Sequence, residues 1–207
     1  MLSKEINFMT HNHEKTKRNY LERMNNSKVK CMIEAKKYEK NYWDGPRKFG
    51  YGGYTYIADR WTNVAKKLIK KFNLKNTSKI LDVGCGKAFI LYEIKKILPS
   101  IDIVGFDISK HGIKNAPKKI RKNLFIQKAQ NKYNFANKEF DLAISTGCFH
   151  NLKINELKFA LNEIQRVSKK TYIMVESYRN EKELFNLQCW ALTCESFFSK
   201  KEWLWLF

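Results

Sequence analysis

Two carboxylates and a glycine-rich turn are the part of the sequence best suited to ligand chemistry. The run Asp82-Val83-Gly84-Cys85-Gly86 follows an apolar stretch and precedes residues with helical spacing. A glycine-rich turn between a strand and a helix brings backbone N–H groups and the helix N-terminus close to a ligand. Many nucleotide-binding sites contain such a turn, so the glycines alone do not identify the ligand.

Two details of this turn narrow the ligand class. The third glycine of the dinucleotide fingerprint is missing, and Ala88 stands where the helix would meet a pyrophosphate. Asp82 lies two residues before Gly84. A carboxylate at that position repels a pyrophosphate but attracts an ammonium or sulfonium group. The charge therefore favours S-adenosylmethionine, a sulfonium nucleoside, over a nicotinamide dinucleotide as the cofactor.

Asp107 supplies a second acid after the next apolar run, Ile103–Phe106. It lies about twenty residues beyond the glycine turn, a spacing typical of carboxylates that bind ribose hydroxyls. Ile108 beside it can pack on adenine. The alternative for Asp107 is that it caps the following helix, which does not exclude ribose binding.

The elements that must position these residues alternate between strands and helices. Short β-rich runs separated by helical stretches predict right-handed βαβ units and an α/β fold with a doubly wound, mostly parallel sheet. The predicted strands are Lys79–Val83, Asp102–Phe106, Leu124–Gln127, Phe140–Ser145 and Thr171–Glu176. The predicted helices between them are Phe89–Leu98, Gly112–Lys122 and Asn155–Val167.

Residues 1–62 are predicted to form an N-terminal arm and substrate lid on a core of residues 63–207. A polar arm precedes an amphipathic helix within Ser27–Lys40, and a second apolar helix face begins at Trp61. Between them, glycine, proline and aromatic residues alternate, which indicates a loop. The candidate substrate-binding residues of this segment are Asp44, Tyr51, Tyr54, Arg60 and Trp61. The alternative is a structural strap in which Trp43 and Trp61 belong to the core.

Three stretches together resemble the signature motifs of class I S-adenosylmethionine-dependent methyltransferases. They are Asp82–Gly86, Gly105–Ser109 and Phe140–Ser145, and the resemblance covers about residues 79 to 177. It implies a Rossmann-like methyltransferase fold and S-adenosyl-L-methionine as the cofactor. The segment Tyr42–Trp61 resembles the leader of a group of bacterial small-molecule methyltransferases.

The resemblance also implies contacts for individual residues. Gly84, Cys85 and Gly86 would contact the methionine part of the cofactor, and Asp107 with Ile108 its adenosine. Ala129 and Gln130 would lie beside the adenine, although Lys128 stands where many members carry an acid. Ser145 and Thr146, at the end of the fourth strand, complete the expected cofactor-binding set.

Methyl transfer requires alignment of the acceptor with the methyl group and exclusion of water. A hydroxyl acceptor also needs a base, whereas an amine must only arrive deprotonated. The candidates follow the fourth and fifth strands, whose carboxyl ends border the ligand crevice. His150 is either a base or a support bonded to backbone, and Glu176 is a candidate base. Tyr178 and Arg179 are candidates for substrate binding, and loop fixing is the alternative for Glu176 as well as for Arg179.

The composition bears on partners and compartment. The formal charge of +20 comes mostly from lysine, with arginine scarce, which favours a solvated basic surface over a nucleic-acid interface. Five cysteines without a C-x-x-C pair fit a reducing cytoplasm and indicate no metal site. No apolar run reaches the roughly 18 residues of a membrane span.

The C-terminal part departs from the family pattern. Two further strands are expected after the fifth, but Glu183–Cys194 and Lys200–Phe207 both have helical patterns, so the sheet is predicted to lack its last two strands. The apolar residues 203–207 either cover the open sheet edge or cause self-association into a homo-oligomer.

The function expected from the sequence is enzymatic: methyl transfer to an O or N atom of a small polar metabolite, such as a sugar derivative or anionic compound. An RNA methyltransferase is one alternative. A catalytically inactive binding or partner subunit with the same fold is another, and a nicotinamide-dependent oxidoreductase is the weakest.

Overall fold

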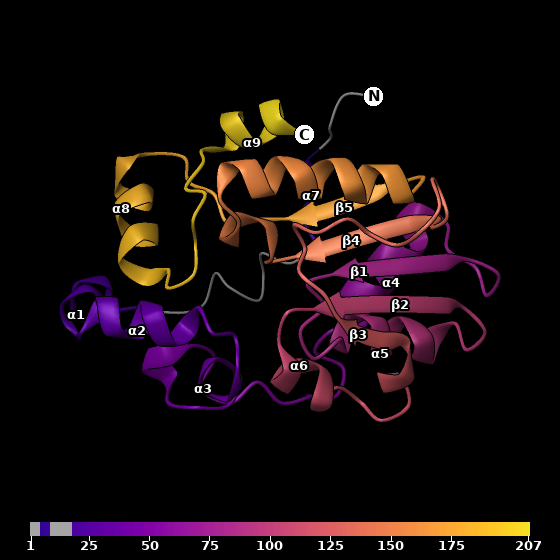
Figure 1. Ribbon diagram of the computed structural model, residues 1–207, viewed down its shortest axis with the longest axis horizontal. Coiled ribbons are helices and arrows are strands. Elements are labelled where there is room, and N and C mark those ends of the chain that lie inside the picture. Colours follow the sequence, from indigo (N-terminus) through magenta and orange to yellow (C-terminus); the bar gives the residue numbers. More distant parts are fainter. Residues whose placement is uncertain (1–4, 9–17) are drawn as a thin grey trace.

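A five-stranded parallel sheet forms the centre of the computed structural model, which describes residues 5–8 and 18–207 (Figure 1). The strand order is β3-β2-β1-β4-β5, and every neighbouring pair is parallel. The strands are β1 Lys79–Val83, β2 Asp102–Asp107, β3 Leu124–Ile126, β4 Leu142–Thr146 and β5 Thr171–Met174. The predicted α/β class and five strand positions are thus confirmed, with end shifts of up to two residues.

The strand order reverses at β1, which pairs with β2 on one side and β4 on the other. Val83 at the end of β1 lies opposite Phe106 of β2, and Asp82 lies opposite Ile144 of β4. In open α/β sheets ligands bind outside the carboxyl ends of the strands at such a switch point. The register therefore brings Asp82 and Asp107 to the expected ligand crevice.

Two cores cover the two faces of the sheet because side chains of β1 alternate between them. Ile80 packs with α4 (Thr62–Phe72) and α5 (Phe89–Ile97), whereas Leu81 packs with α7 (Ile154–Val167). The apolar helix faces predicted at residues 61–72 and 155–167 are the ones buried here. Both faces of the sheet are thereby removed from water.

Four short N-terminal elements lie beside the carboxyl ends of the strands, together with α8 (Glu181–Trp190) (Figure 1). They are α1 Tyr20–Asn25, α2 Lys28–Ala35, α3 Lys40–Trp43 and the 3-10 turn η2 Arg47–Phe49. The Lys28 ammonium donates to the carbonyls of Gln188, Cys189 and Ala191 at 3.1, 2.6 and 2.5 Å. A cation at a helix C-terminus is favourable, so Lys28 fixes α8 to the N-terminal helices.

The helix predicted at Gly112–Lys122 is wrong in its extent. The α6 helix spans only Lys110–Lys114, and a separate 3-10 turn, η3, follows at Arg121–Asn123. Pro117 explains the break, because it lacks a backbone N–H and disfavours helical geometry at the preceding residue. The predicted Ser27–Lys40 helix also divides, since Tyr38 adopts a left-handed conformation at φ +54°.

The segment predicted as a loop from Tyr42 contains the end of α3 and the η2 turn. The predicted Glu183–Cys194 helix is α8, which begins two residues earlier and ends at Trp190.

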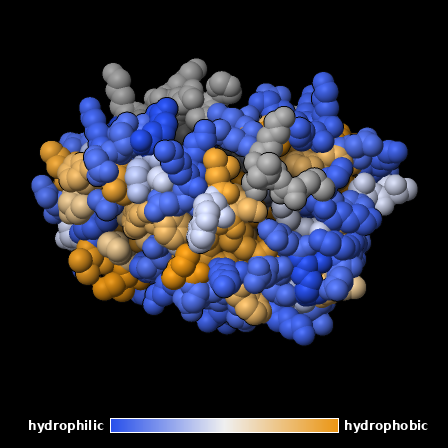
Figure 2. Space-filling model, turned by 90° about the horizontal axis from the view of Figure 1, so that it is seen from above, coloured by the Kyte–Doolittle hydropathy of each residue, from blue (hydrophilic) through white to orange (hydrophobic). Residues whose placement is uncertain are grey.

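The C-terminal helix α9 (Lys200–Leu206) packs over the second core. Trp203 is buried, and its indole N–H donates to the Glu176 carbonyl at 3.1 Å. Trp205 on the same helix is 84% exposed. Figure 2, seen from the side of α7 and α9, shows apolar patches within a mostly hydrophilic surface. Trp203 thus packs on the second core and Trp205 is exposed, while covering of the open sheet edge and self-association both stay predictions.

Over residues 5–8 and 18–207, no helix combines the length and apolarity of a membrane span. The same residues contain no group of three or more His, Cys, Asp or Glu side chains arranged to hold a metal ion.

Candidate cofactor site and its cover

The glycine turn after β1 requires glycine at two positions. Gly84 and Gly86 have φ of +75° and +55°, a region that other residues rarely adopt. A Cβ on Gly84 would lie 2.5 Å from the Cys148 side chain, so the loop after β4 packs directly on the turn. Burial raises the pKa of the Cys148 thiol, which is a packing group and not a thiolate nucleophile.

Asp107 holds the glycine turn through its carboxylate. One oxygen accepts from the Gly86 N–H and the other from the Ser109 N–H, both at 2.8 Å. Burial raises the pKa of Asp107, and these hydrogen bonds oppose the rise. Each oxygen keeps a further lone pair that a ribose hydroxyl can use. Ser109, and not Asp107, is the N-cap of α6, because its hydroxyl accepts from the Gly112 N–H.

Asp82 is the least satisfied buried carboxyl group of the turn. Its side chain is 2% exposed, and Oδ1 has no hydrogen-bond partner among the described residues. Burial, and then the negative charge of Asp107, raise the pKa of Asp82 to about 8. An orphaned carboxylate oxygen beside a glycine turn suits a cationic ligand, so the residues present fit S-adenosyl-L-methionine.

An aromatic segment, residues 38–61, lies against the glycine turn and is called the cover below. A Cβ on Gly86 would lie 2.5 Å from the Trp43 ring. The Trp43 indole N–H donates to Ser109 Oγ at 2.8 Å, and the ring stacks on Tyr51 with centroids 5.3 Å apart. Trp43 is buried, which agrees with the alternative that it is a core residue. The surface that buries it is, however, the candidate ligand site.

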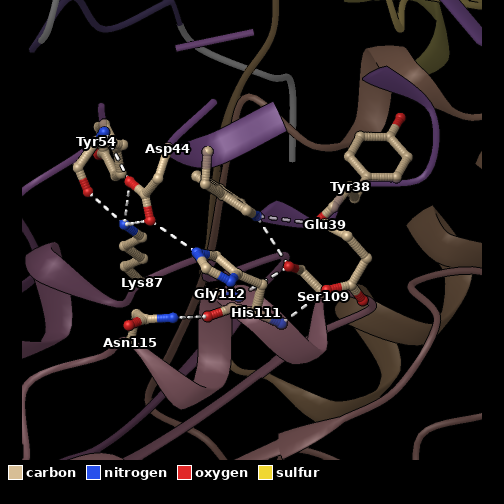
Figure 3. Close-up of polar contacts among 10 residues, drawn as sticks. Tyr38, Glu39, Asp44, Tyr54, Lys87, Ser109, His111, Gly112 and Asn115 are labelled. Carbon is tan, nitrogen blue, oxygen red and sulfur yellow. Dashed lines mark hydrogen bonds and ion pairs between the residues drawn. The ribbon is translucent and has the colours of Figure 1, made fainter. Parts of the chain in front are cut away.

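Charged groups tie the cover to the core (Figure 3). The Lys87 ammonium lies 2.7 Å from both Asp44 oxygens and donates to the Tyr54 carbonyl at 2.7 Å. His111 Nε2 lies 2.7 Å from Asp44 Oδ2. Burial would raise the pKa of Asp44, but the hydrogen bonds from Lys87 and His111 outweigh it and lower that pKa. Asp44, a candidate for substrate binding, therefore has partners within the protein.

Glu39 makes the second attachment of the cover. Its two carboxylate oxygens accept from the backbone N–H groups of Lys110 and His111 at 3.1 and 3.0 Å, in the first turn of α6. Figure 3 shows Glu39 beside His111. Sequence reasoning missed Glu39, Lys87 and His111. Lys87 gave the one available signal, a charged residue directly before a helix whose first residues are all apolar.

The structure places His150 and Glu176 next to each other after β4 and β5. His150 is buried, and its Nδ1 accepts from the Glu176 backbone N–H at 3.2 Å. Burial lowers the pKa of His150, although the Glu176 charge opposes this, so the ring is neutral. With Nδ1 accepting, the ring proton resides on Nε2, and the imidazole can donate to a ligand but not take its proton. This geometry favours the supporting role of His150.

Glu176 and Arg179 differ in the freedom of their side chains. Glu176 is half-buried, and its carboxylate has no hydrogen-bond partner among the residues described. Arg179 has an 80% exposed side chain and pairs with Glu183, its Nε lying 3.0 Å from Oε1. The ion pair of Arg179 with Glu183 is the kind of contact that fixes a loop, while the Glu176 carboxylate remains available to an acceptor. Tyr178 forms an isolated bridge with Ser199.

The remaining candidates for cofactor contact have mixed placements. Ser145 is buried and donates to the Val83 carbonyl at 3.0 Å, so it fixes β4 to β1. Gln130 donates to Glu156 at 3.2 Å, and the buried Ala129 offers its carbonyl to Tyr133. Ile108 is 41% exposed beside Asp107, which leaves its side chain accessible.

Four further candidates lie around the turn and cover. Burial raises the pKa of the Cys85 thiol well above its ordinary value. Thr146 is half-buried at the end of β4. Arg60 is exposed, and Trp61 is half-buried against the first core, as the structural alternative for it predicts.

Comparison with known proteins identifies the class. A family model described as a methyltransferase domain matches residues 74–207, and the chain belongs to this family. Residues 74–207 are therefore a methyltransferase domain of the S-adenosyl-L-methionine-dependent class.

Two solved structures share the fold. The YcgJ protein from Bacillus subtilis superposes with a TM-score of 0.54 at 18% identity, over 69% of this chain and 64% of that one. A chain of the complex between the Haloferax volcanii Trm112 methyltransferase activator and a putative methyltransferase gives 0.55 at 17% identity, covering 73% of this chain and 76% of that one.

A curated relative is the ribosomal RNA small subunit methyltransferase C of Buchnera aphidicola. It is 33% identical over 94 residues, which are 44% of this chain and 28% of that protein. The chain therefore matches less than a third of this relative's length.

Proposed function

We propose that this methyltransferase transfers the methyl group of S-adenosyl-L-methionine to an O or N atom of a small polar metabolite. The observation that carries the proposal is the cover, which lies on the glycine turn and is tied to the core through Asp44 and Glu39. An acceptor must react behind this aromatic segment, where water is excluded. Such a cover suits a small acceptor better than a nucleic-acid strand.

The proposed cofactor contacts follow from charge and exposure at the turn. When bound, the cofactor supplies an electrophilic methyl group on a cationic sulfur. Asp82 has a buried oxygen without a hydrogen-bond partner in the described part of the protein, which suits the positive charge of the cofactor. Asp107 keeps lone pairs for the ribose hydroxyls, and the accessible Ile108 can pack on the adenine.

The proposed acceptor contacts come from the end of β5 and from the cover. Glu176 is the candidate base for a hydroxyl acceptor because its carboxylate is half-buried and unpaired within the described part of the chain. His150 positions Glu176 through its bond to the Glu176 N–H. Tyr51 and Tyr54 offer flat surface for the body of the acceptor.

The proposal is tested by labelling with S-adenosylmethionine that carries an isotopic methyl group. The protein is incubated with the low-molecular-mass fraction of a cell extract and, separately, with its RNA. We expect label in a small product. Label recovered in RNA alone would show the proposal to be wrong.

A matched pair of variants then tests the role of Glu176. With a hydroxyl acceptor, Glu176→Gln should lower turnover by about 100-fold or more, the range typical of general base catalysis, and leave cofactor affinity unchanged. Glu181→Gln removes an exposed carboxylate at the start of α8 and should leave both quantities unchanged. Equal effects of the two substitutions would remove Glu176 from its proposed role.

RNA methylation is the second candidate function, favoured by the ribosomal RNA methyltransferase relative and by the charge of +20. The labelling experiment separates the two directly. A protein that binds the cofactor but methylates neither fraction would favour an inactive partner subunit.

A further inference from the structure

Three arginines from separate segments converge on one tryptophan at the end of α8. The guanidinium carbons of Arg18, Arg23 and Arg47 lie 4.2, 5.3 and 5.2 Å from the centroid of the Trp190 ring. Arg18 precedes α1, Arg23 lies within it, and Arg47 belongs to the cover. These three arginines are called the arginine cluster below.

The positive charge of the arginine cluster is not balanced within the described part of the protein. No carboxylate of that part lies within 4.0 Å of any of the three guanidinium groups. Burial lowers the pKa of Arg23 and of Arg47, and the charge of Arg18 lowers that of Arg47 further. One indole ring stabilises cations through its face but carries no net charge to neutralise three of them.

The cluster also holds hydrogen-bond donors without acceptors. The Nε atoms of Arg18 and Arg23 are both buried and have no hydrogen-bond partner among residues 5–8 and 18–207. Arg23 Nη1 donates to the Lys48 carbonyl at 2.7 Å, and Arg47 Nη1 donates to the Gly50 carbonyl. These bonds fix the two side chains but leave other N–H groups free. Buried unsatisfied donors are costly, which indicates that an external acceptor completes them.

Neutralisation of the α8 C-terminus does not explain the cluster. Lys28 already donates to three carbonyls at this end of the helix and has no remaining N–H for a ligand. The arginines instead contact the ring of Trp190. Their charges therefore exceed what the helix end requires.

We propose that Arg18, Arg23 and Arg47 form a binding site for the phosphate or pyrophosphate group of a small phosphorylated molecule. Guanidinium groups bind such oxyanions through two parallel hydrogen bonds, and the free Nε–H of Arg18 and of Arg23 belongs to such a fork. An open hollow of about 610 Å³ adjoins Arg18. Its lining combines the polar Asn19, Lys182 and Asn186 with Tyr20, Leu21 and Phe185. The remainder of a small ligand fits there.

Arg47 connects this site to the glycine turn. It lies on the cover, four residues before Tyr51. Tyr51 stacks on Trp43, and Trp43 in turn packs on Gly86. The proposed function then implies that the phosphorylated molecule is the methyl acceptor, anchored at a distance from its reacting atom. The anion site itself does not depend on this assignment.

A nucleic-acid strand fits the cluster less well. Single-stranded nucleic acids are bound by stacking their bases on aromatic faces while cations follow the backbone. Here the guanidinium groups lie over the Trp190 ring, so no base can stack on the face that they cover. The arrangement suits a compact anion.

The test measures binding of inorganic pyrophosphate by titration calorimetry at constant ionic strength. We expect saturable binding by the natural protein and at least tenfold weaker binding by Arg18→Gln, which loses charge-assisted bonds. The triple Arg-to-Gln variant should lose binding altogether. Arg18→Lys keeps the charge but lacks the fork, so its affinity should fall between those of the natural protein and Arg18→Gln.

A charge-matched control separates a built site from general attraction. Lys66, Lys67 and Lys70 on α4 are exposed, and their triple Lys-to-Gln variant removes the same three charges. We expect its pyrophosphate affinity to change by less than twofold. Equal losses in both triple variants, or no saturation by the natural protein, would overturn the proposal.

Two further measurements complete the test. Arg18 makes no hydrogen bond in the described structure, so Arg18→Gln should fold, and its unfolding temperature checks this. The binding of a short RNA oligonucleotide is measured with the same variants. If RNA binding depends on the arginine cluster and pyrophosphate binding does not, the proposal is overturned in favour of nucleic acid. Arginine-dependent pyrophosphate binding without methylation of any phosphorylated compound would support the anion site and contradict only its link to the acceptor.

Discussion

Asp82→Asn should change stability and cofactor binding in opposite directions. The Asp82 pKa is 3.8 in its ordinary state and about 8 in the fold. Below pH 3.8 the carboxyl is protonated in both states, and its contribution to stability is complete. As the pH rises toward 8, the unfolded chain releases the proton while the fold retains it, so stability falls by about 1.4 kcal/mol for each pH unit.

The magnitude follows from this window of about four pH units. It gives an upper bound of roughly 6 kcal/mol lost by the natural protein between pH 4 and pH 8. Asparagine cannot ionise, although its buried amide costs about 1–3 kcal/mol if unpaired. At pH 8 the variant should be more stable by at most roughly 3–5 kcal/mol. For about 200 residues this raises the unfolding temperature by roughly 10 °C.

Cofactor binding should show the reverse effect. A cation binds the ionised form of Asp82, so the affinity of the natural protein for S-adenosylmethionine should rise with pH up to about 8. Asp82→Asn should bind more weakly and lack this dependence. S-adenosylhomocysteine has a neutral sulfur but the same ammonium group. If the affinity for S-adenosylhomocysteine does not depend on pH, Asp82 interacts with the sulfonium group. If both compounds show the same pH dependence, Asp82 interacts with the ammonium group.

Thermal unfolding by circular dichroism and calorimetric titration from pH 4 to 8 at fixed ionic strength provide the two measurements. Asp102→Asn, at the exposed opposite end of β2, is the control and should change neither. A variant that is less stable than the natural protein at pH 8, with the same pH slope, would refute the reasoning about the buried charge.

Three other substitutions test the turn, the cover and the C-terminal helix. Asp107→Ala should weaken cofactor binding by about 1–3 kcal/mol in calorimetry, because charge-assisted bonds are lost; unchanged affinity in a folded variant would place the ribose elsewhere. Lys87→Met leaves Asp44 without its main partner and should cost about 2 kcal/mol, less than a fully buried pair because Asp44 is 26% exposed. Hydrogen exchange should then accelerate in residues 44–56, and unchanged protection would show that the ion pair does not hold the cover. Trp205→Ser removes an 84% exposed ring and should reduce self-association in sedimentation experiments; a natural protein that sediments as a monomer would contradict that expectation.

The sequence predicted the sheet well because its signals are local. The strand runs are apolar and short, and the acids at their ends stand at fixed distances from the glycines. Asp82 and Asp107 consequently reached adjacent strand ends, as predicted. The extent of α6 was the main local error, since Pro117 outweighed the apolar spacing around it.

The attachments of the cover could not be predicted because they join residues far apart in the chain. Asp44 meets Lys87 across 43 positions and His111 across 67. Periodic sequence patterns do not reveal contacts between such distant residues. The sequence around Asp44 therefore could not distinguish a substrate-binding role from attachment of the cover. The arginine cluster escaped notice for the same reason, since its members and Trp190 come from four segments.

The three hydrogen bonds of Lys28 restrict how this protein can be recombined with its relatives. They join α2 to the end of α8, across 160 to 163 positions of the chain. A chimera that receives a foreign N-terminal segment but keeps its own α8 would leave those carbonyls uncapped and Trp190 without its arginines. An attempt to change acceptor specificity by exchanging segments must therefore transfer the N-terminal segment and α8 together and keep the sheet of the receiving protein.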